Sequence, residues 1–133
     1  MTPALWCVLI AALLPYVAAT LAKAGGERYD NRDPREWLRR QEGWRVRANH
    51  AQLNGFEAFP FFAAAVIVAQ MLQAQQERVD ALAVIFIATR AGYLVAYLAD
   101  WHWARSIAWL IGWLACIFLF VSGAQMAAGS PVQ

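Results

Sequence analysis

Four polar side chains, Arg47, His50, Asn54 and Glu57, lie at the start of a segment that is otherwise apolar enough to cross a membrane. At about 100° per residue they fall within an arc of roughly 80° on one face of a helix. A charge near the centre of a bilayer costs on the order of 3 kcal/mol, so it must be satisfied internally, by pairing or by a polar ligand. We call this face the first stripe and expect the functional site there.

The composition is that of a helical membrane protein. Of the 133 residues, 61% are hydrophobic and 15% are charged, whereas a soluble domain is about 45–50% apolar. Four runs reach the length of about 20 residues that a helix needs to span a bilayer. They cover residues 3–22, 46–73, 80–99 and 104–126. We therefore expect an all-α integral membrane four-helix bundle, a single domain over residues 1–133, with a polar loop at residues 23–45.

The charges predict how the chain lies in the membrane. Most of its basic residues fall between Lys23 and Arg47, and basic loops stay cytoplasmic. The first and third connections are therefore expected in the cytoplasm, with both ends of the chain on the opposite side. No basic residue precedes the first apolar run, which favours an uncleaved helix over a secretory signal. The net charge of +2 gives no argument for a nucleic-acid partner.

A second stripe lies on the third run, where Arg90, Tyr93, Tyr97 and Asp100 repeat the spacing of the first stripe. A short connection makes the two helices antiparallel neighbours, so the stripes are expected to face each other. Four pairs of side chains then lie at equal depth. The first and last pairs join opposite charges, and the two pairs between them can form hydrogen bonds. The predicted pairs are Arg47 with Asp100, His50 with Tyr97, Asn54 with Tyr93, and Glu57 with Arg90.

Two interpretations of the stripes stay open. They could serve only to link the two helices, as polar side chains do in membranes. Each buried hydrogen bond of this kind contributes only about 0.6 kcal/mol on average, which favours a functional site for such ionisable groups. Pro60 frees a backbone carbonyl and bends its helix. It either opens a cavity beside Glu57 or is simply tolerated.

The polar loop is expected to contain a short helix. Asp33 suits the N-cap, Pro34 the first helical position and Glu36 the third. Gly43 suits a C-terminal stop, which predicts a helix over Pro34–Glu42. Its neighbouring apolar side chains fit either the lipid headgroup layer or packing of a loop helix on the bundle. They are Trp37, Leu38 and Trp44.

Arg105 stands where the fourth run enters the membrane, and it can reach either lipid phosphates or an anionic ligand held by the stripes. His102 fits the water interface, with no metal-ligand spacing around it. Cys7 and Cys116 lie inside predicted spans, where free cysteine behaves as a small hydrophobe. Neither a disulfide framework nor a metal site is expected.

The stretch from Arg47 to Phe61 resembles the second helix of the MAPEG family, the membrane-associated proteins in eicosanoid and glutathione metabolism. The family pattern continues from a basic residue to Asn, then Glu three positions on, then Pro and an aromatic residue, as in Asn54, Glu57 and Pro60 here. Residues 29–35 look like the loop of bacterial members, and the resemblance covers nearly the whole chain. The third and fourth helices carry the matching residues Arg90, Tyr93, Tyr97 and Arg105.

The resemblance implies a homotrimer in the bacterial inner membrane, with glutathione as co-substrate bound between subunits on the cytoplasmic side. It implies a glutathione-dependent transferase or peroxidase that acts on a lipophilic small molecule from the bilayer. Arg105 would be the catalytic residue that helps to ionise the thiol. The residues expected to bind glutathione are Arg47, His50, Asn54, Glu57, Arg90, Tyr93 and Tyr97.

Three positions depart from the glutathione enzymes of that family. His50 replaces an arginine and is a poorer clamp for a carboxylate. Ala58 stands where one branch has tyrosine, and the arginine of the first helix has no clear match, Lys23 being nearest. The alternative function is therefore a non-enzymatic lipid-binding or scaffold protein of the same fold. A small transporter is disfavoured because four helices without an internal repeat lack the usual architecture.

Overall fold

The structure, a computed structural model, describes residues 1–25 and 27–129. Along these residues the elements are all helices. Their bounds are α1 (Pro3–Lys23), α2 (Pro34–Arg39), α3 (Trp44–Met71), α4 (Gln76–Leu98) and α5 (His102–Gly129). All but α2 are long and apolar enough to cross a membrane. The predicted all-α membrane bundle is confirmed.

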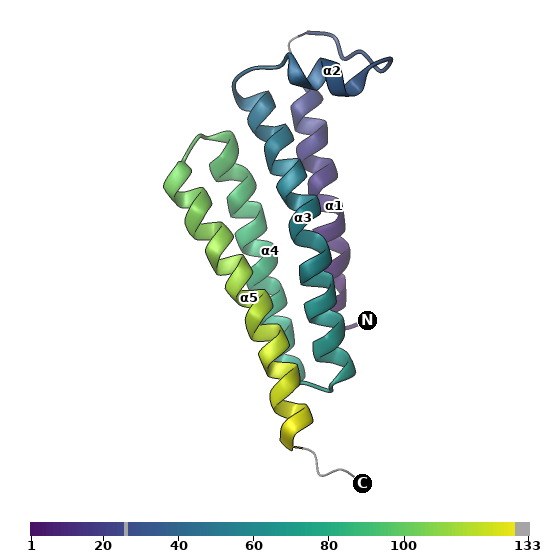
Figure 1. The fold of residues 1–133 in the computed structure, drawn as a ribbon, viewed down its shortest axis with the longest axis vertical. Coiled ribbons are helices and arrows are strands. Elements are labelled where there is room, and N and C mark those ends of the chain that lie inside the picture. The colour runs from purple at the N-terminus through teal and green to yellow at the C-terminus, as the bar shows by residue number, and fades with distance from the viewer. Residues whose placement is uncertain (26, 130–133) are drawn as a thin grey trace.

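The four long helices form two close pairs. α1 packs along α3, α4 packs along α5, and further contacts join the pairs. The chain runs up and down, so that α2 and the turn between α4 and α5 lie at one end of the bundle (Figure 1). The start of α1 and the turn between α3 and α4 lie at the other. We call the first of these the α2 end.

Two residues in the left-handed conformation end the helices before the predicted limits. Gln73, with a φ of 53°, follows α3, and Asp100, with a φ of 61°, follows α4. The next backbone N–H closes each helix, from Ala74 to the carbonyl of Ala69 at 2.9 Å and from Trp101 to that of Ala96 at 2.8 Å. This Schellman arrangement satisfies carbonyls that the helix leaves without partners. Both connections are therefore tight turns.

Small residues let the helices approach closely, as is common in membrane bundles. At Gly55 of α3, an added Cβ would lie 2.9 Å from Cγ of Pro15 on α1. At Gly112 of α5, it would lie 2.9 Å from Oγ1 of Thr89 on α4. The buried face of α1 recurs every three or four residues and is almost entirely small. It consists of Ala4, Cys7, Ala11, Pro15, Ala18 and Ala22.

Larger side chains fill the space where the two pairs meet. Phe62 of α3 stacks on Phe86 of α4, with ring centroids 3.9 Å apart. Leu119 of α5 is fully buried in the same cluster. The outward faces carry exposed apolar side chains such as Leu13 and Val95. Surfaces of this kind meet lipid or another subunit.

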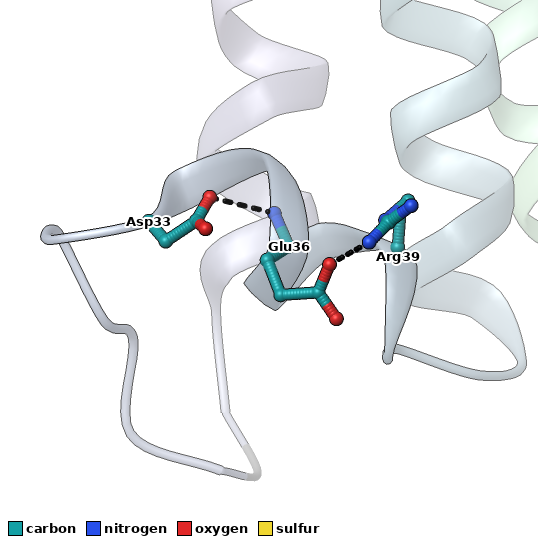
Figure 2. Close-up of polar contacts among 3 residues, drawn as sticks. All are labelled: Asp33, Glu36 and Arg39. Carbon is teal, nitrogen blue, oxygen red and sulfur yellow. Dashed lines mark hydrogen bonds and ion pairs between the residues drawn. The ribbon is translucent and has the colours of Figure 1, made fainter.

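The predicted loop helix forms, but it is shorter than expected. Oδ1 of Asp33 accepts the backbone N–H of Glu36 at 3.1 Å, which confirms the N-cap, and Glu36 pairs with Arg39 one turn on (Figure 2). α2 ends at Arg39, so the predicted end at Glu42 is wrong. Gly43, with a φ of 63°, precedes α3 and does not end α2.

Trp37 holds the polar loop together. It is fully buried, its ring meets Tyr29 edge-on, and its Nε1 donates to the carbonyl of Arg28 at 2.9 Å. Nε2 of Gln41 donates to the Trp37 carbonyl at 3.0 Å. Of the two predicted environments, packing within the protein is confirmed for Trp37 and the headgroup layer is wrong for it. Trp44 is exposed.

Asp80 ties α4 to α1 at the end opposite α2. Its Oδ1 accepts the backbone N–H of Ala4 at 2.9 Å and Nε2 of Gln76 at 2.8 Å. Ala4 lies in the first turn of α1, where N–H groups lack partners within the helix and the helix dipole favours a negative charge. A carboxylate from α4 thus satisfies the N–H of Ala4, in addition to the N-cap that Thr2 of the same chain end gives to the N–H of Leu5.

Replacing Asp80 by alanine is expected to lower the free energy of unfolding by about 1 kcal/mol, the usual effect of losing a helix cap. The measurement is denaturant unfolding in detergent micelles. Glu77→Ala is the matched control because Glu77 is an exposed acid on the same turn of α4. Equal losses in the two variants would contradict the capping role.

Candidate functional site

The two polar stripes face each other across α3 and α4, as predicted. Nη2 of Arg90 donates to Oδ1 of Asn54 at 2.8 Å. The ring of His50 meets that of Tyr97 edge-on, with centroids 6.3 Å apart, but the predicted hydrogen bond between these side chains is absent from the described residues. Arg90 is only 8% exposed, and a buried charge is costly unless it is hydrogen-bonded. Asn54 supplies the acceptor that this guanidinium needs.

The predicted ion pair between Arg47 and Asp100 is wrong. α4 ends at Leu98, so Asp100 lies beyond the helix and is exposed. Arg47 instead donates through Nε to the carbonyl of Tyr97 at 3.0 Å and through Nη2 to that of Leu98 at 2.9 Å. These carbonyls belong to the last turn of α4, where partners within the helix are missing and the dipole favours a cation, although that of Tyr97 also accepts the N–H of Asp100 at 3.2 Å. Arg47 therefore caps α4.

The predicted ion pair between Glu57 and Arg90 is also wrong. In the described part of the chain, the ion pair present joins Arg39 to Glu36. Arg90 bonds to Asn54, which lies three residues, or about 4.5 Å, before Glu57 along α3. Glu57 is exposed, and its carboxylate is available to a ligand.

Arginine and tyrosine side chains of α4 and α5 stack in a continuous row. Cζ of Arg90 lies 4.3 Å from the centroid of the Tyr93 ring. The Tyr93 and Tyr97 rings meet edge-on at 5.5 Å, and Cζ of Arg105 lies 4.4 Å from the centroid of the Tyr97 ring. A cation over an aromatic face is stabilised by about 0.5–2 kcal/mol. Arg105 is thereby held beside the second stripe.

A cavity of about 240 Å³, which we call the upper chamber, lies beside this row. It brings together residues from α3, α4 and α5 near the turn that joins α4 to α5. They are Asn54, Tyr93, Arg105, Ser106 and Trp109. The predicted pair Asn54 and Tyr93 therefore shares a cavity, and no hydrogen bond joins their side chains in the residues that the structure describes. The upper chamber combines a guanidinium, an amide and two hydroxyl groups.

A second cavity, of about 260 Å³, shares Asn54 and Trp109 with the upper chamber. We call it the lower chamber. Glu57 and Arg90 lie on its polar side, so a cavity does occupy the place beside Glu57 that the sequence singled out. The rest of its wall is apolar and largely aromatic. These residues are Ala58, Phe61, Phe86, Trp109, Gly112, Trp113 and Cys116.

The apolar wall contributed by α5 was missed by the sequence analysis. Arg105, Trp109, Gly112, Trp113 and Cys116 recur every three or four residues, which places them along one helix face. This spacing, which continues from Arg105, is the sequence signal for the wall. Within residues 1–25 and 27–129, no group of three or more His, Cys, Asp or Glu residues could hold a metal ion.

Fold and site together define an integral membrane helical bundle with a polar, arginine-bearing candidate site. Comparison with known proteins then identifies the family. The model of the MAPEG family matches residues 3–125, which include three of the spanning helices in full and most of α5. The chain belongs to the MAPEG family, as the resemblance predicted. No curated protein matches the sequence.

Asn54→Ala is expected to lower the free energy of unfolding by about 2 kcal/mol, because it leaves the buried Arg90 guanidinium without its acceptor. Arg90→Met in the same chain should restore part of that loss, since apolar replacement of a buried charge is often neutral. The measurement is a double-mutant cycle of unfolding in detergent. Strictly additive losses would show that the two side chains are not coupled.

Proposed function

We propose that this protein is a membrane-bound, glutathione-dependent transferase or peroxidase that acts on a lipophilic electrophile. The observation that carries the proposal is the upper chamber, where Arg105, Tyr93 and Asn54 meet around about 240 Å³. The thiolate is the reactive form of a thiol, and a guanidinium stabilises it without ever losing its own charge. Membership of the MAPEG family supports the same choice.

Glutathione carries two carboxylates, an ammonium group and a thiol. The polar residues of the two stripes and Arg105 would offer a partner for each of these groups. Arg105 would hold the sulfur, and the exposed carboxylate of Glu57 would pair with the ammonium group. His50 and Arg90 would meet the carboxylates, while Tyr97 and Tyr93 would donate hydroxyl hydrogen bonds. Charge-assisted hydrogen bonds of this kind are about twice as strong as neutral ones.

Arg47 receives a different role from the one predicted. Two of its nitrogens already donate to the last carbonyls of α4. In this proposal it is a positioning residue that fixes the end of α4, which carries Tyr93 and Tyr97. It contributes to glutathione binding through those tyrosines and not by contact.

The chemistry follows from the thiolate. In the transferase reaction its sulfur forms a bond to an electrophilic carbon, a leaving group such as chloride departs with its bonding electrons, and the thiol proton passes to water. In the peroxidase reaction, two glutathione molecules are oxidised to one disulfide while a hydroperoxide is reduced to an alcohol and water. Both reactions need the thiolate held beside an apolar entrance.

The same proposal gives the protein its place in the membrane. Most basic residues lie at the α2 end, between Lys23 and Arg47, so this end and the candidate site would face the cytoplasm. The membrane would be the bacterial inner membrane. The protein would form a homotrimer, in which exposed apolar faces of the spanning helices supply the contacts between subunits.

A non-enzymatic lipid-binding protein of the same fold is the second candidate. The mostly apolar wall of the lower chamber favours it, as does His50 in place of the arginine of the glutathione enzymes. It would show no affinity for glutathione at millimolar concentration, and lipid would copurify with the protein.

Arg105→Ala is expected to lower kcat for conjugation of chlorodinitrobenzene by about tenfold to a hundredfold, with a much smaller change in glutathione affinity. The ultraviolet absorbance of bound thiolate should fall with kcat, because the guanidinium that stabilises the anion is gone. Arg35→Ala, at an exposed position on α2, is the matched control and should leave both unchanged.

Two outcomes would contradict this account at different points. A wild-type protein that binds no glutathione at millimolar concentration would overturn the proposed function. An Arg105→Ala protein that keeps its thiolate absorbance and its kcat would overturn the role of Arg105 alone.

A further inference from the structure

A third cavity, of about 350 Å³, lies between α4 and α5, and its residues differ from those of both chambers. We call it the outer groove. Its walls are Arg78 and Leu82 of α4 and Phe118, Val121, Ser122 and Gln125 of α5. By their spacing, the residues contributed by α5 fall on the helix face opposite the one that lines the lower chamber. The proposed thiol chemistry therefore makes no use of the outer groove.

The polar and apolar side chains of the outer groove lie at different depths. Arg78 is the third residue of α4 and Gln125 lies near the end of α5, so both belong to the end of the bundle opposite α2 (Figure 1). Leu82 follows Arg78 by four residues, which is about 6 Å toward the middle of the bundle. Phe118 precedes Gln125 by seven residues, which is about 10.5 Å in the same direction. The outer groove is thus cationic at its opening and apolar further in.

The described residues give Arg78 no ionic partner. Its Nη1 donates to Oε1 of Gln125 at 3.4 Å, which is long for a hydrogen bond. In the described part of the chain, no ion pair includes Arg78. Two acids are close in the sequence, but Glu77 is turned about 100° and Asp80 about 160° away from Arg78 around α4. Asp80 accepts hydrogen bonds from Ala4 and from the side chain of α4 one turn before it.

A capping role like that of Arg47 does not fit Arg78. It lies in the first turn of α4, where the groups without partners are N–H donors and the helix dipole favours a negative charge. A guanidinium at this end neither caps the helix nor gains from the dipole. An anion placed beside Arg78 would be stabilised by the guanidinium and by the helix end together.

We propose that the outer groove binds one anionic phospholipid, with its phosphate at Arg78 and one acyl chain over Leu82 and Phe118. The forked donors of a guanidinium match the oxygens of a phosphate. Because Gln125 turns its Oε1 toward Arg78, its amide N–H groups remain to donate to the same phosphate. The site needs neither chamber, so it is independent of the proposed function and of its alternative.

Two features favour this lipid over other amphiphiles. The described walls include no carboxylate, so the ammonium group of phosphatidylethanolamine would find no partner there, whereas the glycerol hydroxyls of phosphatidylglycerol would meet Gln125. Pockets for ligands start at about 300 Å³, so the outer groove has room for a headgroup and the start of a chain. The rest of the chain would follow the exposed Ile85 and Leu114, which continue the faces of Leu82 and Phe118.

The test is native mass spectrometry of the full-length protein, released from detergent micelles and titrated with dioleoyl phosphatidylglycerol or dioleoyl phosphatidylethanolamine. The wild type should bind one phosphatidylglycerol per subunit, about tenfold more tightly than phosphatidylethanolamine. Arg78→Gln should weaken the binding of phosphatidylglycerol by about tenfold to a hundredfold and abolish this preference. Arg35→Gln, at an exposed arginine of α2, is the matched control and should leave the affinity within about twofold of wild type.

A second pair of variants tests the space of the outer groove without changing a charge. Val121→Trp fills the groove from a position that is 43% exposed, so the core of the bundle is not disturbed. It should weaken the binding of phosphatidylglycerol by about tenfold, because the chain and the ring compete for the same space. Val84→Trp makes the same change at an exposed position of α4 outside the groove and should have no effect.

A loss confined to Arg78→Gln and Val121→Trp would support the site, whether or not the protein binds glutathione. Equal affinity of the wild type for both phospholipids, or equal losses in each variant and its control, would overturn it. Inorganic phosphate or oleate that binds as tightly as phosphatidylglycerol would show a site for a free anion or a fatty acid, and would overturn the phospholipid. A change in oligomeric state in Arg78→Gln, with lipid binding intact, would assign the groove to a second subunit instead.

Discussion

A guanidinium buried inside an apolar bundle must keep a hydrogen-bond acceptor, and the candidate site of this protein is arranged around that requirement. Arg90 is almost fully buried on α4, and Asn54 on α3 meets it at 2.8 Å. Because the amide of Asn54 is neutral, satisfying Arg90 uses no carboxylate, and the exposed Glu57 forms no ion pair among the described residues. Both side chains line the lower chamber, Arg90 buried and Glu57 exposed.

The need for hydrogen-bond partners also determines the contacts at the ends of the helices that frame the site. Arg47 donates to the carbonyls of Tyr97 and Leu98 in the last turn of α4, and Asp80 accepts the N–H of Ala4 in the first turn of α1. Each charge has the sign that the helix dipole favours at that end. These two contacts join α3 to α4 and α4 to α1 at opposite ends of the bundle. They explain how a bundle packed largely through alanine and glycine holds its helices in register.

The sequence predicted the membrane bundle and the facing of the stripes, because apolar length and helical spacing are local properties of the chain. It predicted the contact between His50 and Tyr97 for the same reason. It gave wrong partners for Arg47 and Arg90, because these depend on where α4 ends and on how far a long side chain reaches. The left-handed turn at Asp100 decides where α4 ends and therefore which partner Arg47 finds. The spacing of charges along the sequence does not indicate where such a turn falls. The aromatic wall of α5 was missed because apolar residues on a membrane helix resemble lipid-facing ones.

The central claim is that the first stripe faces a polar space inside the bundle and not lipid. Spin labels at position 57 and at position 95, in a chain with Cys7 and Cys116 replaced by alanine, test it most directly. Val95 is exposed and lies three residues before the end of α4, whereas Glu57 lies 13 residues after the start of α3, so Val95 is nearer the α2 end. The account predicts that the label at 57, although deeper, is more accessible to a water-soluble nickel complex than the label at 95. A label at 57 that responds only to oxygen, as a lipid-facing residue does, would contradict it.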